Sequence, residues 1–255
     1  MPFQKIQTDR IADSVVMQIE QLILRGILRG GERLPSERDL AERLGVSRPS
    51  VREAIATLQE KGLLTTKASA GIFVADLLGN AFTAPLTDLF STHDEAVFDY
   101  ISFRRDLEGM AAERAATHGS ETDLKIIQTI MDKMEQTHGD ENPMAEAALD
   151  AEFHMAIIEA SHNVFLLHMV RSMFDMLKKG VFYNRQVMFN QHSTREALLD
   201  QHRTICAAIQ SRNATAARAA VGDHMTFIET CMQDAKKAQA NEEIAKLRLD
   251  HTVGG

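Results

Sequence analysis

The sequence contains very few cysteines and few large aromatic residues. Only 2 Cys, 2 Tyr and no Trp occur among its 255 residues, whereas Met and Phe number 13 and 12. Two cysteines cannot form a disulfide framework, which excludes a disulfide-stapled fold and fits a reducing compartment. Strands are enriched in aromatic residues, so the shortage of Trp and Tyr argues against an all-β fold.

A long apolar run is also missing. No stretch approaches the roughly 20 uncharged apolar residues that a membrane-spanning helix needs, and the first ten residues contain no apolar signal core. We therefore expect a cytoplasmic protein with no membrane partner. The composition, with 44% hydrophobic and 25% charged residues, is that of a globular protein, and the length favours two domains.

The charge is distributed unevenly between the two parts of the chain. Residues 1–75 contain 11 Lys and Arg against 9 Asp and Glu, whereas the remaining residues contain 17 against 27. A mildly basic head on an acidic body suits a polyanionic partner at one end of the chain.

Residues 1–75 predict three helices followed by a hairpin. Apolar residues recur at three- and four-residue steps between positions 11 and 28, as on the buried side of a helix. Ser36 and Ser47 are suited to cap the next two helices, and Pro49 fits the first turn of the third. Residues 63–66 and 72–74 flank a turn of small residues, as the strands of a hairpin would. This order predicts a winged helix-turn-helix.

The start of the third helix presents Arg48, Ser50 and Arg52 to solvent, because its apolar positions face inward. The planar guanidinium of arginine can neutralise a phosphate and donate to base edges. An arginine-rich solvated face is the alternative. The ordered series of caps, glycines and hairpin favours DNA binding.

Residues 31–64, from GERLPSERDL to EKGLL, resemble the DNA-binding domain of the GntR transcription factors. The shared motifs are Leu-Pro-Ser-Glu-Arg, Gly-Val-Ser-Arg and Val-Arg-Glu-Ala. The resemblance implies direct operator contacts by two arginines at positions 38 and 48, and a wing that reaches the minor groove. The wing of this chain has side chains at positions where family members have glycine. Glycine would permit a closer approach of the backbone to DNA. The implied DNA-binding residues are Arg38, Arg48, Ser50, Arg52, Lys67 and Ser69.

The rest of the chain predicts an all-helical second domain, so the expected fold class is mostly α. We expect a linker and connecting helix over 76–92, and a bundle of six to seven helices over 93–238. Helix starts are indicated by capping patterns such as Ser120 with Asp123. Residues 239–255, which end in Val-Gly-Gly, are expected to form a disordered tail.

Four residues of this region have the character of metal ligands. Asp150 and His154 are four residues apart, so they share one face of a helix. His202 and His224 lie within the apolar patterns of two later helices and are expected to face the core. Taken alone, such inward histidines are more often hydrogen-bonded core residues than ligands.

The helical region resembles the effector domain of the FadR-type branch of GntR regulators. The signatures are RRDLE at 104–108, DAEFH at 150–154 and EASHNV at 159–164. In metal-binding members of that branch one Asp and three His converge inside the bundle. The resemblance implies a divalent metal, and we expect zinc first, with nickel, manganese and iron(II) as alternatives. The implied ligands are Asp150, His154, His202 and His224.

Arg104 matches an inward arginine of the same branch, which implies that it binds a small carboxylate effector beside the metal. A salt bridge to Glu108, four residues along the helix, is the alternative role for this side chain. The run from Glu159 to Met173 resembles the pyruvate dehydrogenase complex repressor and its lactate-responsive relatives. This resemblance suggests pyruvate, lactate or glycolate as the effector.

The resulting hypothesis is a homodimeric bacterial transcription repressor that binds a palindromic operator and responds to a small carboxylate. A metal sensor, in which the ion itself is the signal, is one alternative. A metalloenzyme with a DNA-binding head is another. The sequence contains no His-Glu-x-x-His helix, no Gly-x-Ser-x-Gly elbow and no phosphate-binding glycine loop, which disfavours the enzyme.

Overall fold

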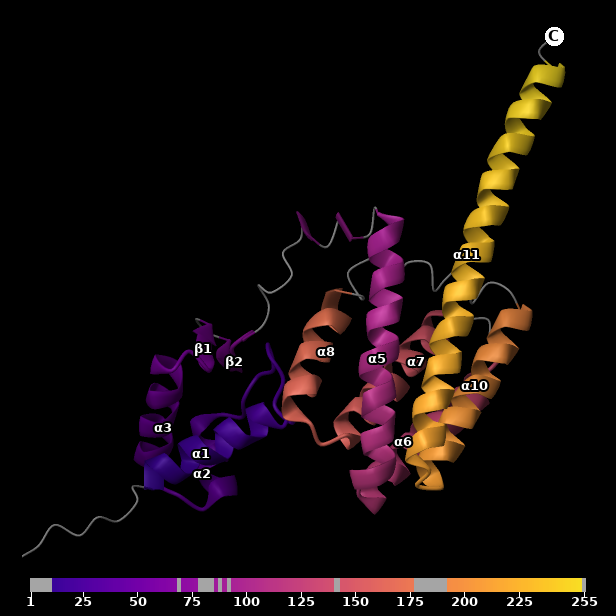
Figure 1. Cartoon of the computed structure of the whole chain (residues 1–255). Coiled ribbons are helices and arrows are strands. Elements are labelled where there is room, and N and C mark those ends of the chain that lie inside the picture. The colour runs from indigo at the N-terminus through magenta and orange to yellow at the C-terminus, as the bar shows by residue number, and fades with distance from the viewer. Residues whose placement is uncertain are drawn as a thin grey trace, which may run out of the picture. The chain divides into compact units, whose positions relative to one another are not determined.

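The structure is a computed structural model of the chain, and it describes residues 11–67, 70–77, 85–86, 89–90, 93–139, 143–176 and 192–253. The chain divides into two compact units, residues 1–81 and 82–255. Within the described residues, nine helices of eight residues or more accompany one two-stranded hairpin, which confirms the predicted mostly-α fold class (Figure 1). No helix in this part of the chain is long and apolar enough to span a membrane.

The first unit is a helix-turn-helix with a wing, as the sequence predicts. The hairpin strands pair antiparallel, with Leu64 opposite Val74 and Lys67 opposite Gly71. Apolar residues from all three helices and both strands form one core. In chain order the elements are α1 (Ile11–Leu24), α2 (Glu37–Leu44), α3 (Arg48–Glu60), β1 (Leu64–Lys67) and β2 (Gly71–Val74).

Local chemistry explains where α2 and α3 begin. The hydroxyl of Ser36 accepts the backbone N–H of Asp39, and that of Ser47 accepts the backbone N–H of Ser50. Each bond satisfies a donor that a helix start leaves without a partner. α1 ends at Leu24, so the expectation of a helix extending to residue 28 is wrong. The chain turns there through Gly26, whose φ of 71° lies in the left-handed region that glycine adopts without steric cost.

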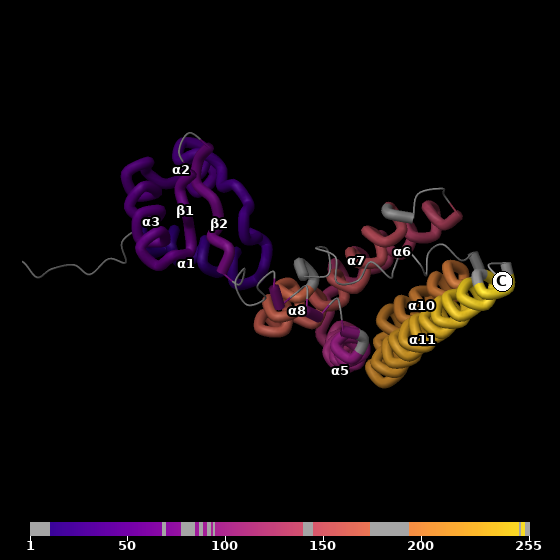
Figure 2. Tube along the Cα trace, turned by 90° about the horizontal axis from the view of Figure 1, so that it is seen from above, coloured from indigo at the N-terminus to yellow at the C-terminus, as the bar shows by residue number. Residues whose placement is uncertain are grey.

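The second unit is a bundle of helices. α5 packs along α11, α6 lies against α7, and α10 contacts α5, α6 and α11. α10 and α11 run side by side in both views of the chain (Figures 1 and 2). The described helices are α5 (Asp94–His118), α6 (Glu121–Thr137), α7 (Pro143–Ala160), α8 (Val164–Met176), α10 (His192–Gln210) and α11 (Ala214–Val253).

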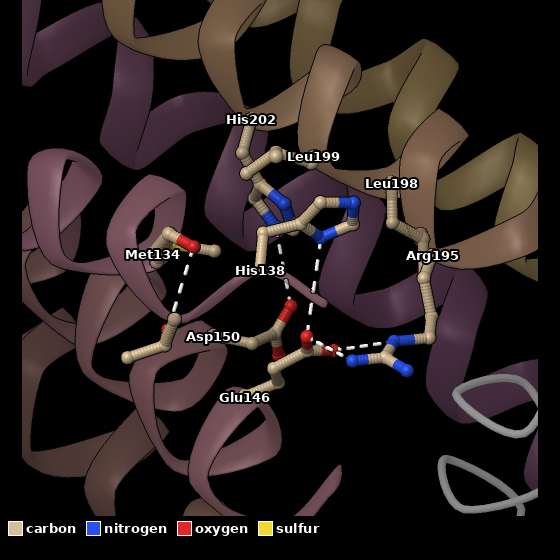
Figure 3. A pocket seen from close by; sticks show the side chains of 9 residues that line it. Met134, His138, Glu146, Asp150, Arg195, Leu198, Leu199 and His202 are labelled. Atoms are coloured by element: carbon tan, nitrogen blue, oxygen red, sulfur yellow. Dashed lines mark hydrogen bonds and ion pairs between the residues drawn. The ribbon is translucent and has the colours of Figure 1, made fainter. Parts of the chain in front are cut away.

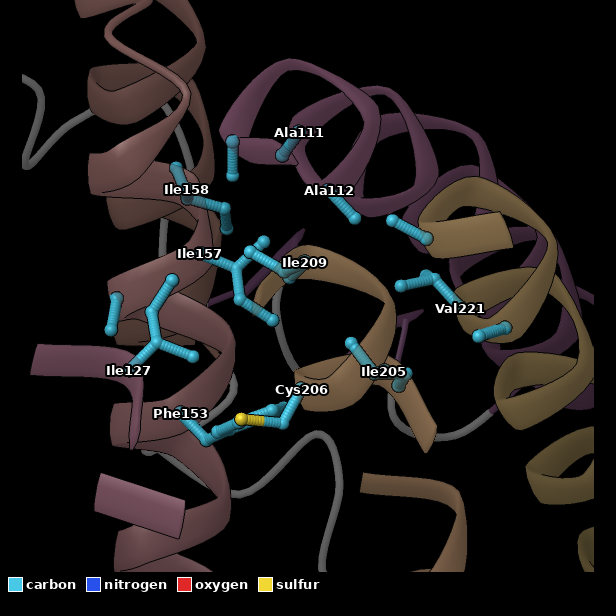
Figure 4. Close-up of a cluster of buried hydrophobic side chains, with 14 of the residues drawn as sticks. Ala111, Ala112, Ile127, Phe153, Ile157, Ile158, Ile205, Cys206, Ile209 and Val221 are labelled. Carbon is cyan, nitrogen blue, oxygen red and sulfur yellow. The ribbon is translucent and has the colours of Figure 1, made fainter. Parts of the chain in front are cut away.

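One apolar core connects these helices (Figure 4). Phe153 and Ile157 of α7 meet Ile205 and Ile209 of α10, and all four side chains have exposed fractions of 2% or less. The small side chains of α5, including Ala111 at 0% exposure, allow neighbouring helices to approach closely. This packing holds α5, α7, α10 and α11 in fixed register around the polar site described below.

The predicted disordered tail is wrong as far as Val253, because α11 continues to that residue. It extends past the end of α5 (Figure 1). Residues 239–249 are rich in Ala, Glu, Lys, Leu and Arg, which have high intrinsic helix propensity. A helix that is already nucleated propagates through such residues at little cost. Much of the linker expected at 76–92 lies outside the described residues.

Candidate functional site

The predicted DNA-contacting residues lie on α2, α3 and the hairpin of the first unit. Arg48 is the first residue of α3 and is exposed. The side chain of Arg38 on α2 is 78% exposed and lies 3.6 Å from Asp39. These two arginines, the expected direct contacts, are therefore accessible to a large anion.

The other candidates on this unit have intramolecular partners. Both Nε and Nη2 of Arg52 donate to Glu37, at 3.2 and 3.0 Å, which ties α3 to α2. The hydroxyl of Ser50 lies 2.8 Å from that of Ser47. Lys67 lies over the ring of Phe73, and Ser69 lies outside the described residues. The DNA-contacting roles of these residues stay predictions.

In the second unit, three helices bring the four predicted metal ligands together. Asp150 and His154 come from α7, His202 from α10 and His224 from α11. Their exposed fractions are 5%, 1%, 1% and 0%. One ligand atom from each side chain lies within 4.8 Å of those of the other three. The cluster that the family resemblance implied is therefore present in the fold.

The separations between ligand atoms suit a shared ion. Oδ1 of Asp150 lies 3.1 Å from Nε2 of His202 and 3.7 Å from Nε2 of His154. The two histidine Nε2 atoms are 3.4 Å apart. Ligands held about 2.1 Å from one ion lie about 3 to 3.4 Å from each other. Small adjustments of these side chains would complete such a site.

Close polar contacts on the opposite ring nitrogens orient two of the histidines. Nδ1 of His154 lies 2.6 Å from a carboxylate oxygen of Glu108, and Nδ1 of His224 lies 2.9 Å from Oε1 of Gln201. Both oxygens can only accept, so each Nδ1 carries the proton and each Nε2 presents a lone pair. Nε2 of His224 is buried with no hydrogen-bond partner among the described residues. A metal ion would satisfy it.

The electrostatics of the site favour neutral imidazole. Burial lowers the pKa of His224 well below its usual value of 6.5, and the neighbouring His202 and His154 lower it further. Metal ligation requires the unprotonated ring, so the fold prepares this side chain for an ion. Burial alone would raise the pKa of Glu108, but the charge of Arg104 and the contact with His154 outweigh burial and lower it to about 2. This carboxylate is therefore ionised.

Arg104 contacts the predicted ligand His154 indirectly, through Glu108. It is 5% exposed, and its Nε donates to Glu108 at 2.6 Å. Burial would lower the pKa of Arg104, but the charge of Glu108 raises it. The salt bridge that the sequence left open as an alternative is present. An effector-binding role for Arg104 stays a prediction.

A pocket opens beside the cluster, and Asp150 and His202 are among the residues that line it (Figure 3). The sequence did not single out Glu146 and Arg195, which also line it. A helical signal was available, because Glu146 is four residues before Asp150 and Arg195 seven before His202. The contacts of Glu108 with His154 and of Gln201 with His224 were not predicted either, because each joins residues far apart in the sequence.

Family comparisons match both units. Residues 11–74 match the GntR family of bacterial regulatory proteins, and residues 99–227 match the FCD domain. The Glc operon transcriptional activator of Escherichia coli K12 is 33% identical over 227 residues, which cover 88% of this chain and 89% of that protein. The chain belongs to the GntR family. It is a FadR-type regulator with an FCD domain, as the sequence predicted.

Further comparisons agree with this assignment. A regulatory protein of E. coli K12 named for the L-lactate dehydrogenase operon is 34% identical over 247 residues, covering 95% of this chain and 94% of that protein. The fold of the GntR regulator resembles that of Streptococcus agalactiae GntR, with a TM-score of 0.50, 24% identity and coverage of 85% and 98%. The relatives are transcriptional regulators and not enzymes, so the metalloenzyme alternative is set aside.

Replacing Glu108 should weaken metal binding by the GntR regulator. In Glu108→Gln the side chain keeps its shape but loses the charge that holds Nδ1 of His154. Loss of such a partner lowers metal affinity by about 10- to 100-fold. Competition with a chromophoric chelator measures this, with Glu113→Gln as the matched control, a half-buried position on the same helix whose carboxylate pairs with Arg218. Equal zinc affinity in both folded variants would contradict the assigned role.

The metal-free regulator should lose stability as the solution becomes acidic. His224 has a lowered pKa when folded, so the unfolded chain binds more protons below about pH 6.5. Its stabilising contribution is complete above pH 6.5 and is lost as pH falls toward the folded pKa. The slope reaches at most about 1.4 kcal/mol per pH unit for one proton.

Urea unfolding of chelator-treated protein between about pH 7.5 and about pH 5.5 measures this dependence. His224→Gln should reduce the slope, whereas His118→Gln, which removes an exposed histidine, should leave it unchanged. Equal slopes in the two variants would show that His224 is not the titrating group.

Proposed function

We propose that this GntR regulator binds operator DNA as a homodimer, and that a small carboxylate bound beside a divalent metal in the helical unit controls its affinity. The observation that carries the proposal is the convergence of four buried ligand side chains next to a pocket. Family membership supports the DNA-binding part of the proposal, since the first unit matches the GntR family over residues 11–74.

The first unit would read the operator through α3. Arg48 at its first residue and Arg38 on α2 are exposed, as contacts to phosphates and base edges require. A two-fold dimer places two such units on a palindromic site. Arg52 would contribute by holding α3 against α2 through Glu37, and could also meet a phosphate.

The second unit would hold the ion with the carboxylate of Asp150 and three imidazoles. A mixed nitrogen and oxygen set suits zinc first, and nickel, manganese or iron(II) as well. When bound, the ion would supply positive charge and a coordination position for a carboxylate oxygen. Glu108 and Gln201 would keep the histidines oriented, and the apolar core around Phe153 would exclude bulk water.

Two lines support a small carboxylate as the effector. A positively charged site accepts an oxyanion, and similar chains are named for the Glc and L-lactate dehydrogenase operons. We therefore propose glycolate, L-lactate and pyruvate as the first candidates. We propose repression as the sign of regulation from the sequence resemblance, although one of these relatives is named as an activator.

Control requires that the effector bind two conformations with different affinity. The pocket is lined by residues of α6, α7 and α10, so a molecule bound there would contact two of the three helices that carry the predicted ligands. For repression relieved by the effector, the conformation that binds DNA poorly must bind the effector more tightly.

A titration of operator binding tests the proposal. The operator is first selected from a random-sequence duplex pool, and its affinity is measured by fluorescence anisotropy with zinc-loaded protein. Saturating L-lactate, glycolate or pyruvate should change that affinity by about fivefold or more. No change with any of the three would contradict the proposed effector class.

The same titration distinguishes the carboxylate sensor from a metal sensor, the alternative in which the ion itself is the signal. The complete set of four buried ligands favours that alternative. If zinc removal alone changes operator affinity and none of the three carboxylates does so at constant zinc, the ion is the signal. A response to carboxylate at constant zinc supports the proposal.

Arg48→Ala should lose about 1 to 3 kcal/mol of operator affinity, because the exposed guanidinium at the start of α3 can no longer reach phosphate or base. Arg248→Ala, an exposed position on α11, is the control for a loss of positive charge in the second unit. Thermal melting should show that both variants remain folded. Operator affinity that is equal in the two variants would remove Arg48 from the DNA contacts.

A further inference from the structure

The pocket beside the predicted metal ligands is lined by residues of three helices. These come from α6 and the residue after it, α7 and α10, and they include Asp150 and His202. Leu198 and Leu199 form an apolar wall (Figure 3). Arg104 does not line this pocket. A molecule that enters here and approaches the ligands meets a different arginine, Arg195.

Arg195 is already engaged with a carboxylate. Its Nε donates to Oε2 of Glu146 at 2.9 Å, and its Nη2 donates to the other oxygen of the same carboxylate. This is the parallel, two-bond geometry with which arginine recognises carboxylates in general. The two side chains are only 13% and 8% exposed, so solvent screens the pair weakly.

Glu146 has further partners that hold it in place. It accepts the backbone N–H of Gly139 at 3.2 Å, and one of its oxygens lies 3.9 Å from Nδ1 of His138. Loss of Arg195 as a partner would therefore not leave this carboxylate without hydrogen bonds. Exchange of the partner of Arg195 is accordingly less costly than breaking an isolated buried ion pair.

The pair lies close to the metal ligands along both helices. Glu146 precedes Asp150 by four residues on α7, about 6 Å along the axis, and Arg195 precedes His202 by seven on α10, about 10 Å. Both spacings return to the same helix face. The pair therefore joins α7 to α10 at the pocket, one to two turns from the residues that would hold the ion.

We propose that Arg195 binds the carboxylate of the effector, and that this carboxylate replaces the carboxylate of Glu146. The replacement opens a direct ionic connection between α7 and α10. This inference rests on the proposed function, because it identifies the residue that recognises the effector and the contact that changes. Arg104 contacts Glu108, which in turn contacts His154.

A pair of variants that both lack this ion pair tests the proposal. Glu146→Gln removes the internal carboxylate and retains Arg195, whereas Glu146→Gln with Arg195→Gln removes both charges. The two variants lack the same ion pair, so any shared loss of stability cancels in the comparison. Zinc content by elemental analysis checks that the metal ligands are unaffected.

Calorimetric titration of the zinc-loaded proteins uses glycolate, L-lactate and pyruvate as probes. Any probe that binds the wild type should bind Glu146→Gln at least as tightly, because its competitor is gone. The double variant should bind it about tenfold or more weakly than Glu146→Gln, with unchanged zinc content.

Equal affinity in the two variants would overturn the role of Arg195 and leave the proposed function standing. Failure of all three probes to bind the zinc-loaded wild type would overturn both. If Glu146→Gln with Arg195→Lys binds the probe as tightly as Glu146→Gln alone, positive charge alone suffices and the two-bond recognition is wrong.

Discussion

Burial of several polar side chains inside an apolar helical bundle is the constraint on which the second unit depends. Asp150, His154, His202 and His224 are each at most 5% exposed, and an unsatisfied buried polar group costs free energy. The fold offsets that cost with a chain of partners, from Arg104 through Glu108 to His154. Burial lowers the pKa of His224, and the neutral ring avoids most of the penalty of burying charge.

This constraint explains why the bundle is packed as it is. The site needs contributions from α5, α7, α10 and α11, and each must be held in register to within a fraction of a helical turn. Small residues on α5 and the apolar layer around Phe153 and Ile205 supply that register. The apolar core and the polar site are thus two results of the same packing.

The two units also divide the work of a regulator. The first unit exposes the arginines that are predicted to contact DNA, whereas the second buries its charged groups beside a pocket, where the proposed ion would bind. In the proposed mechanism, a signal would pass as a change in helix positions in the second unit. The Glu146 and Arg195 pair is suited to this because it joins two ligand-bearing helices at the pocket.

Much of the fold could be predicted, because its signals are local. Ser36 and Ser47 mark the starts of two helices, because each hydroxyl accepts the backbone N–H three residues later. Asp150 and His154 share one helix face because they are four residues apart. The pairing of Arg195 with Glu146 could not be predicted, since 49 residues separate them and only tertiary packing joins them. The full length of α11 was not predicted, because a polar, alanine-rich segment suits a frayed helix and a disordered tail as well as a continued helix.

The central claim is that Asp150 and three histidines hold one metal ion. X-ray absorption at the metal edge, on protein purified without chelators, examines this directly, since it reports the identity and distances of the ligands. The account predicts about one zinc or similar divalent ion per chain, with imidazole nitrogen and carboxylate oxygen near 2.0 to 2.2 Å and no sulfur. Absence of a stoichiometric metal after reconstitution would contradict it. So would a sulfur ligand about 2.3 Å from the metal, which would have to come from Cys206 or Cys231.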